Sequence, residues 1–229
     1  MSITVPYWQK SIIEDMARDL QQRYATWKGA PLSLPINTDE IVEKFLQLRL
    51  ELEDLRHRLN MPDVLGATWF EEKCIRIDSS LEEKEGRLSF TMAHEIGHWW
   101  MHRPIYEMNK VTVPLFVCEA GKPPSPAVVC RSSGKKQPAE WQADQFAAML
   151  LMPAFLMRTA LKSIHTTGSM TVDNLNDFEN VALNQNLRKV SKIFIDELGF
   201  SNVSVDAMCY RLADLNLVTD SANQQGILF

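Results

Sequence analysis

The segment 90–102, FTMAHEIGHWWMH, constrains the fold of this chain more than any other stretch. It contains His94, Glu95 and His98 in the order H-E-x-x-H. Residues four apart on an α-helix share one face, so the two imidazoles can bind a single metal ion. The acid next to the first histidine projects beside that ion, where it can accept a proton from a metal-activated water. The sequence therefore predicts a helix that carries a metal site.

The same helix is expected to be buried. Apolar residues occupy most of its other positions, and an unpaired buried Glu or His would cost several kcal/mol, so its charged groups need partners. Thr91 or Ser89 is expected to cap its N-terminus. Gly97 costs about 1 kcal/mol relative to Ala inside a helix. That glycine indicates the close approach of another backbone.

Two histidines leave the site incomplete, because hydrolytic zinc takes three protein ligands and leaves its fourth position to water. In the extended form of the motif, the third histidine would stand where this chain has Pro104. His102 lies two turns after His94, about 12 Å along the axis at 1.5 Å per residue, which is too far to share one ion. We interpret His102 as a pocket or core residue.

A second segment, 138–153 with the sequence PAEWQADQFAAMLLMP, supplies the expected third ligand. Its apolar residues recur at helical spacing, and prolines stand at both ends. Glu140 and Asp144 lie four residues apart on this helix. We assign Glu140 to the metal and Asp144 to the second ring N–H of a ligand histidine. The alternative is that both acids are solvated on an exposed face.

These two segments resemble the signatures of the ImmA/IrrE family of bacterial and phage zinc metallopeptidases. The resemblance covers residues 87–153, from RLSFT and HEIGH to EWQADQFAAMLLMP, in the family's order. It implies an α+β, zincin-like fold, mostly helical with a small sheet beside the active-site helix. It also implies Zn²⁺ held by His94, His98 and Glu140, with Glu95 as general base. Family members of known role cleave, or relieve repression by, helix-turn-helix repressors, so the resemblance implies a repressor of that type as the protein substrate.

Composition narrows the function class further. The chain has 229 residues, 45% of them hydrophobic, and a formal net charge of −5. A phosphate-binding surface needs an excess of Lys and Arg, so direct nucleic-acid binding is not expected. Neither a span of eighteen apolar residues nor a signal peptide is recognisable, and we expect no membrane contact and a cytoplasmic location. Four scattered cysteines are expected to be free thiols, although Cys118 and Cys130 flank a turn and leave a redox or second metal role open.

Three regions are expected along the chain. Residues 1–60 should form N-terminal helices that pack on the core: a helix over 6–27, then one capped by Asn37 or Thr38 that continues to Leu59. Residues 61–165 should form the catalytic core, beginning with two short strands at 65–70 and 74–78. One of these is expected to be an edge strand that pairs with an extended substrate, with a plain hairpin as the alternative. Residues 166–229 should be helical, with one helix over 172–199 and another capped by Ser204.

The segment 103–137 is the least predictable. Alternating valines suggest strands at 111–117 and 128–129, and the segment is interpreted as either a wall of the substrate cleft or a surface loop. Tyr106 and His102 are candidates for stabilising an oxyanion, with packing as the alternative role. Arg211 is the only basic residue in the segment 201–218, SNVSVDAMCYRLADLNLV, which superficially resembles a helix-turn-helix, so DNA reading by this segment is not expected.

The function that the sequence predicts is zinc-dependent hydrolysis of a peptide bond. Two alternatives remain open at this point. One is a non-catalytic protein, stabilised by zinc, that sequesters a repressor or a toxin–antitoxin partner. The other is hydrolysis of a small amide. A structural zinc site is closed by four protein ligands, often cysteines, and has no need of an acid beside its first histidine. The retained Glu95 therefore favours the enzyme.

Overall fold

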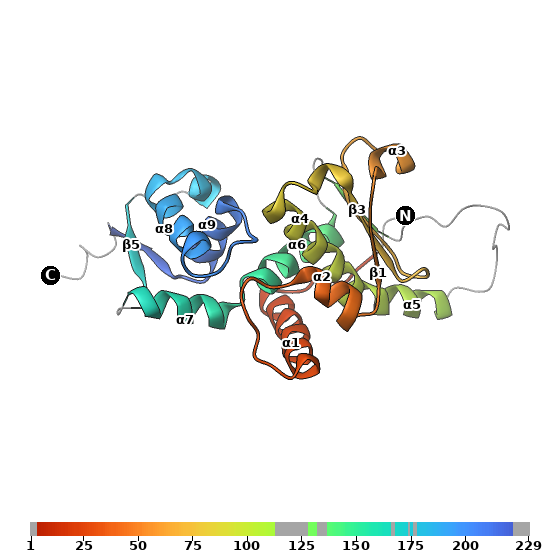
Figure 1. Ribbon diagram of the computed structural model, residues 1–229, viewed down its shortest axis with the longest axis horizontal. Helices are drawn as coiled ribbons and strands as arrows, with labels where there is room; N and C mark the ends of the chain where they lie inside the picture. Colours follow the sequence, from red (N-terminus) through yellow and green to blue (C-terminus); the bar gives the residue numbers. More distant parts are fainter. Residues whose placement is uncertain are drawn as a thin grey trace. The chain divides into compact units, whose positions relative to one another are not determined.

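The computed structural model describes residues 4–112, 128–131, 137–165, 168–173, 175 and 178–221. The chain forms two compact units, the first from residues 1–32 and 37–150 and the second from 33–36 and 151–229 (Figure 1). The first sequence motif and residues 138–150 of the second lie in the first unit. The three regions expected from the sequence stay a prediction, because packing units and functional regions need not share their boundaries.

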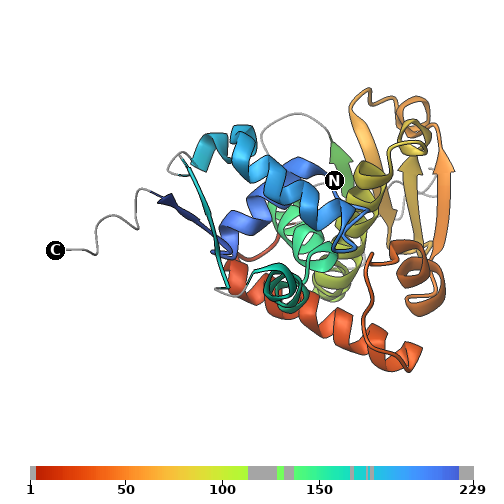
Figure 2. The same cartoon turned by 60° about the vertical axis from the view of Figure 1, so that its left-hand side comes forward.

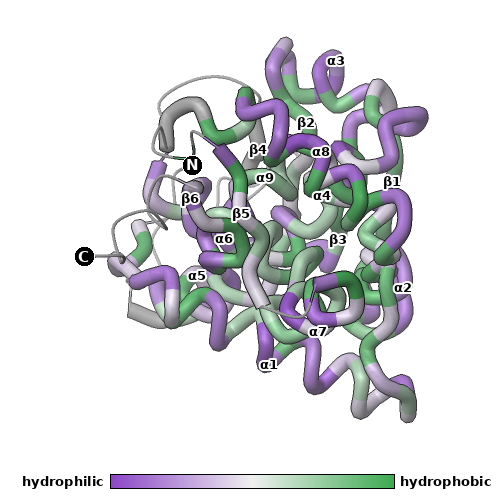
Figure 3. Tube along the Cα trace, turned by 90° about the vertical axis from the view of Figure 1, so that its left-hand side faces the viewer, coloured by the Kyte–Doolittle hydropathy of each residue, from purple (hydrophilic) through white to green (hydrophobic). Residues whose placement is uncertain are grey.

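The first unit begins with the helix α1 (Lys10–Lys28), which buries Ile13, Leu20 and Tyr24 on one face. Hydrophilic and hydrophobic stretches alternate along its tube in Figure 3, as expected for a helix with one buried face. Gly29 ends α1 in the left-handed conformation at φ 66°. The next element, α2 (Thr38–Glu40), is capped by Asn37, whose side chain accepts a hydrogen bond from the Glu40 amide. The helix over 6–27 and the Asn37 cap are thus confirmed within a few residues.

The expected second helix does not reach Leu59. It ends after the π-helical turn η1 (Ile41–Phe45), and Gln47 then adopts a positive φ of 56°. The strand β1 (Arg49–Glu53) follows, and α3 (Leu55–Leu59) is a separate short helix capped by Asp54. The sequence RLELE alternates charged and apolar residues with the period of a strand. It forms a strand and not a helix because β1 pairs with β3.

Four strands form a mixed sheet in the order β1-β3-β2-β4. The antiparallel pair β2 (Val64–Trp69) and β3 (Cys74–Asp78) is the hairpin that the sequence predicted. β1 pairs with β3 in parallel, and β4 (Val128–Arg131) pairs with β2 antiparallel. Among the strands of the described residues, the edges of this sheet are therefore β1 and β4. The hypothesis that β2 or β3 is an edge strand for substrate is wrong, because both have a neighbour on each side.

The motif helix α4 (Glu85–Gly97) packs against β2 and β3, with the sheet beside it as in Figure 2. It begins earlier than expected, so Ser89 and Thr91 do not cap it, and the Thr91 hydroxyl donates to the Arg87 carbonyl within the helix. The helix continues through a π-helical turn, η3 (His98–His102), into α5 (Arg103–Thr112). Residues 111 and 112 are thus helical, not extended. The other residues of the strand expected at 111–117 lie outside the described part of the chain.

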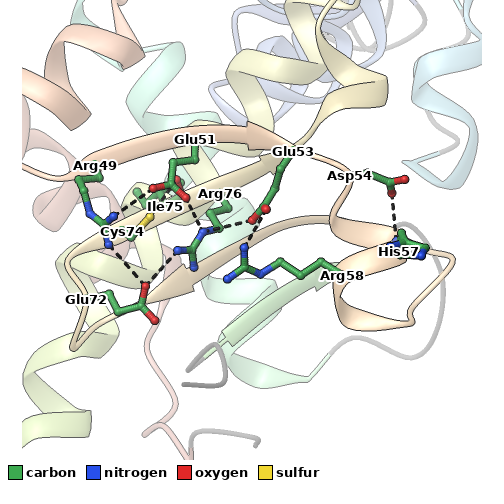
Figure 4. A network of polar contacts seen from close by, with 10 residues as sticks. All are labelled: Arg49, Glu51, Glu53, Asp54, His57, Arg58, Glu72, Cys74, Ile75 and Arg76. Atoms are coloured by element: carbon green, nitrogen blue, oxygen red, sulfur yellow. Dashed lines mark hydrogen bonds and ion pairs between the residues drawn. The ribbon is translucent and has the colours of Figure 1, made fainter. Parts of the chain in front are cut away.

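A network of charged residues covers the opposite face of the sheet from α4 (Figure 4). Alternation along β3 places Arg76 on that face, next to Ala67 across the strand pair. Arg76 is nearly buried, stacks over Trp69 at 4.3 Å, and donates to Glu51 at 2.6 Å and Glu72 at 3.0 Å. The hydrogen bond from Arg76 lowers the pKa of Glu51. The charges on this face balance within the network, so we read it as structural.

The second motif helix, α6 (Pro138–Leu151), has the predicted bounds. The side chain of Gln21 on α1 donates to the carbonyls of Met149 and Leu150, which fixes the C-terminal turn of α6. Where α6 crosses α4, a Cβ on Gly97 would lie 3.1 Å from the Phe146 ring. The close neighbour of Gly97 is therefore the buried side chain of Phe146. The expectation that another backbone lies close to Gly97 is wrong.

The second unit contains α7 (Ala154–Ile164), α8 (Gln185–Asp196) and α9 (Val205–Asp214), with a 3₁₀ turn η4 (Phe178–Leu183). Two short parallel strands, β5 (Met170–Val172) and β6 (Val218–Asp220), complete it. The expectation of one helix over 172–199 is wrong for the described residues before α8. The Asn184 side chain caps the start of α8 by accepting hydrogen bonds from the Asn186 and Leu187 amides. The Ser204 cap of α9 is confirmed, because the Ser204 hydroxyl accepts a hydrogen bond from the Ala207 amide. Arg211 is buried and donates to the Met152 carbonyl.

No single helix in the described part of the chain is long and apolar enough to cross a membrane; only α6 and α7 taken together pass such a test.

The contact between Gly97 and Phe146 yields a stability prediction. Gly97→Ala gains about 1 kcal/mol in helix propensity, but its methyl group overpacks a fully buried ring at a cost of about 1–3 kcal/mol. We expect the free energy of unfolding, measured with urea on metal-free protein, to fall by about 1 kcal/mol. In a Phe146→Leu background the methyl group has room, so the same change should be neutral or stabilising. Equal effects in both backgrounds would contradict this packing argument.

Candidate metal centre

The three predicted metal ligands, His94, His98 and Glu140, lie close together. His94 and His98 come from consecutive turns of α4 and η3, and their Nε2 atoms lie 2.9 Å apart. Glu140 on α6 places its Oε2 atom 3.4 Å from Nε2 of His94 and its Oε1 atom 3.3 Å from Nε2 of His98. Both histidines are fully buried, and Glu140 is partly exposed. One ligand atom from each of the three residues lies within 4.8 Å of the ligand atoms of the other two, so the group can hold a metal ion.

Asp144 supports the first of these histidines, as the sequence predicted. Its Oδ1 atom lies 3.0 Å from Nδ1 of His94, one helical turn after Glu140 on α6. A carboxylate only accepts hydrogen bonds, so the ring proton of His94 resides on Nδ1 and the Nε2 lone pair points at the other two ligands. The spacing of Glu140 and Asp144 therefore lets one helix both complete the cluster and orient a histidine from another helix.

The second histidine has a different partner, which the sequence did not reveal. Nδ1 of His98 lies 2.9 Å from Nδ1 of His102, and Nε2 of His102 lies 3.0 Å from Oε1 of Gln142. His102 is fully buried, and burial together with the nearby His98 lowers its pKa to about 3, so it is neutral. The recurrence of histidine at 94, 98 and 102 was the available signal. Nothing in the sequence linked His102 to Gln142.

The side chain of Glu95 points at β2. The Thr68 hydroxyl donates to its Oε2 atom at 2.6 Å, and among the described residues no hydrogen-bond partner reaches its buried Oε1 atom. Space for this carboxylate depends on Gly66, where an added Cβ would lie 2.7 Å from Oε1. Thr68 and Gly66 both lie on the face of β2 toward α4 and were missed in the sequence, because strand periodicity does not show what a strand packs against.

The pKa values follow from burial and from the neighbours of each group. Burial raises the pKa of Glu95 to about 7, against the opposing effects of His94 and the Thr68 hydrogen bond. Burial lowers the pKa of His98. Burial also acts to raise the pKa of Glu140, but its close contacts with His94 and His98 outweigh that effect and hold it far below its usual value. The site thus combines a carboxylate that is held ionised, Glu140, with a second carboxyl group, Glu95, that can exchange a proton near neutral pH.

The donor set fits a divalent metal. The Nε2 atoms of His94 and His98 lie 2.9 Å apart, and the carboxylate oxygens of Glu140 lie 3.3–3.4 Å from them. A cation bound between these donors would be held by all three residues. Two imidazoles and one carboxylate form one of the ligand sets of catalytic zinc, in which the fourth position is left to water.

Comparison with known proteins agrees with this geometry. The family model of the IrrE N-terminal-like domain (Peptidase_M78) matches residues 43–177, more than half of the chain. The chain belongs to this family. Membership confirms the resemblance drawn from HEIGH and the second motif, and with it the α+β, zincin-like fold. The family is one of metal-dependent peptidases. No curated protein and no solved structure matched the chain.

The remaining candidates of the sequence lie elsewhere. The Tyr106 hydroxyl donates to Glu71 at 3.1 Å on the surface, and its ring packs against Phe70. This contact favours the packing role. Cys118 and the side chain of Cys130 lie outside the described residues, so their facing arrangement stays a prediction. Cys74 and Cys209 are buried free thiols, as expected.

The hydrogen bond from Thr68 predicts the titration of Glu95. Thr68→Val removes a donor that stabilises the carboxylate, and such bonds are worth about 1.5–3 kcal/mol. We expect the pKa of Glu95 in metal-free protein to rise from about 7 by about one further unit, measured by ¹³C NMR of the labelled carboxyl group. Thr68→Ser keeps the donor and should leave the pKa near that of the parent. An unchanged pKa in Thr68→Val would show that the hydroxyl does not stabilise the charged form.

Proposed function

We propose that this protein is a zinc-dependent endopeptidase, with His94, His98 and Glu140 as its metal ligands and Glu95 as its general base. The observation that carries the proposal is the convergence of two buried histidines and the partly exposed Glu140 beside a buried acid, Glu95, whose Oε1 atom has no partner among the described residues. Membership of a metallopeptidase family supports the reaction class. Zinc is proposed on the ligand chemistry.

The chain's own residues supply the remaining chemistry. A zinc ion bound there would polarise the scissile carbonyl and lower the pKa of a water to about 7. Glu95, held by Thr68 through Oε2, has Oε1 free to accept a proton from the attacking water and to pass it to the leaving amine. Burial raises the pKa of Glu95 to about 7 in the metal-free protein, and a bound cation would favour the carboxylate form that accepts the proton. Asp144 keeps His94 oriented during both steps.

The proposed substrate is a helix-turn-helix transcriptional repressor in the cytoplasm. This part rests on the resemblance of HEIGH and EWQADQFAAMLLMP to the ImmA/IrrE family and on the protein substrate that a peptidase family implies. We do not propose DNA binding by the chain itself. Arg211, the basic residue of α9, is buried and engaged with a carbonyl group.

The non-catalytic alternative makes a different structural demand. A sequestering protein stabilised by zinc would have a closed site with four protein ligands. The described residues offer three, and the carboxylate of Glu95, which lies next to His94 in the sequence, is directed at Thr68 and Gly66. This arrangement favours hydrolysis.

Elemental analysis of three proteins, combined with a cleavage assay, tests the proposal. The parent should contain one zinc per chain and cleave helix-turn-helix repressors encoded near its gene. Glu95→Gln should keep the zinc and lose at least about 100-fold in rate, because it removes only the general base. Glu140→Ala should lose the zinc.

Glu107→Ala, which alters an exposed acid on α5, is the matched control and should behave as the parent does. Equal zinc contents in all variants, with no cleavage by any of them, would contradict the peptidase assignment and favour the sequestering protein.

A further inference from the structure

A continuous chain of hydrogen bonds connects His98 to the N-terminal segment. It runs from Nδ1 of His98 to Nδ1 of His102 at 2.9 Å, and from Nε2 of His102 to Oε1 of Gln142 at 3.0 Å. Gln142 then donates from Nε2 to the carbonyl oxygen of Pro6 at 2.7 Å. His98, His102 and Gln142 are each at most 1% exposed, so water does not compete for these bonds.

The direction of this chain is fixed at its outer end. A backbone carbonyl can only accept, so the amide NH₂ of Gln142 must face Pro6 and its Oε1 must face His102. An amide oxygen can only accept as well, and Nε2 of His102 must therefore carry the proton. A neutral imidazole then has a lone pair on Nδ1, which accepts from Nδ1–H of His98. Nε2 of His98 is left with a lone pair.

We propose that Gln142 and His102, aligned by the Pro6 carbonyl, are positioning residues that set the metal-binding tautomer of His98 before any metal arrives. The proposal rests on the proposed function in taking His98 as a metal ligand. His94 obtains the same tautomer from Asp144 through a single bond. The tautomers of the two histidines are thus set by different groups. A carboxylate sets that of His94, and a chain of neutral groups that ends on the backbone of the N-terminal segment sets that of His98.

Aromatic stacking holds that segment in place. The ring of Trp8 stacks on His102 at 6.0 Å with 13° between the planes, and Tyr7 stacks on Trp141 at 6.4 Å with 10°. Tyr7 is largely exposed, so its contact with Trp141 serves to fix the backbone beside Gln142 more than to bury surface. Residues 6–8 lie outside the region 43–177 that the family model matches. The inference therefore concerns this chain's own N-terminal segment.

The tautomers can be read directly in the full-length parent. Long-range ¹H–¹⁵N NMR spectra of metal-free protein labelled at its five histidines, recorded at pH 8, report which ring nitrogen carries the proton. We expect the proton on Nδ1 of His98 and on Nε2 of His102. A proton on Nε2 of His98 would overturn the proposal, whatever the metal content or activity of the protein.

Variants then test whether the relay controls metal binding. Gln142→Leu breaks the relay, and His102→Phe removes the acceptor for His98 while keeping a ring against Trp8. Each should leave His98 as a mixture of tautomers and weaken zinc binding about 10–100-fold in a chelator competition assay. Gln145→Leu makes the same change on α6 away from the relay and should stay within about twofold of the parent.

The outcomes separate this proposal from the proposed function. If Gln142→Leu keeps the parent's His98 tautomer and zinc affinity, the relay has no positioning role. If the parent shows the expected tautomers but binds no zinc, the proposed function fails while the relay stands. Circular dichroism of each metal-free variant verifies folding, and the measurement on the parent decides the tautomer question even if a variant does not fold.

Discussion

The candidate metal centre depends on the convergence of three electron-pair donors, which a bound cation would stabilise. The Nε2 atoms of two buried histidines face each other at 2.9 Å, and oxygen atoms of Glu140 lie within 3.4 Å of both. Because Asp144 and His102 take the Nδ1 protons, neither histidine has a proton left to share at that point. A divalent metal bound there would stabilise this arrangement of donors.

Packing around the two motif helices maintains this arrangement. Gly97 allows the Phe146 ring to lie against α4, which brings α6 and its acids close to the histidines. Gln21 fixes the C-terminal turn of α6, and Gly66 with Thr68 on β2 directs the carboxylate of Glu95. The same strand, helix and N-terminal segment that look like scaffold in the sequence thus control the positions and protons of the reactive groups.

The sequence predicted what local spacing encodes. H-E-x-x-H and the pair Glu140 and Asp144 gave the cluster, because residues four apart on a helix share a face. Strand β1 was missed, since RLELE within a helical stripe becomes a strand only through its pairing with β3. Thr68 and the link from His102 to Gln142 were missed for the same reason: each joins residues 27 to 40 positions apart, and periodicity carries no information on such contacts.

X-ray absorption at the zinc edge of the purified protein tests the central claim most directly, because it reports the atoms around the metal without requiring a substrate. The account predicts a shell of nitrogen and oxygen at about 2.0–2.1 Å, multiple scattering from two imidazoles and no sulfur. Cys74 and Cys209 are buried free thiols and have no place in this site. A sulfur shell at about 2.3 Å, or scattering from three imidazoles, would contradict the assigned ligands.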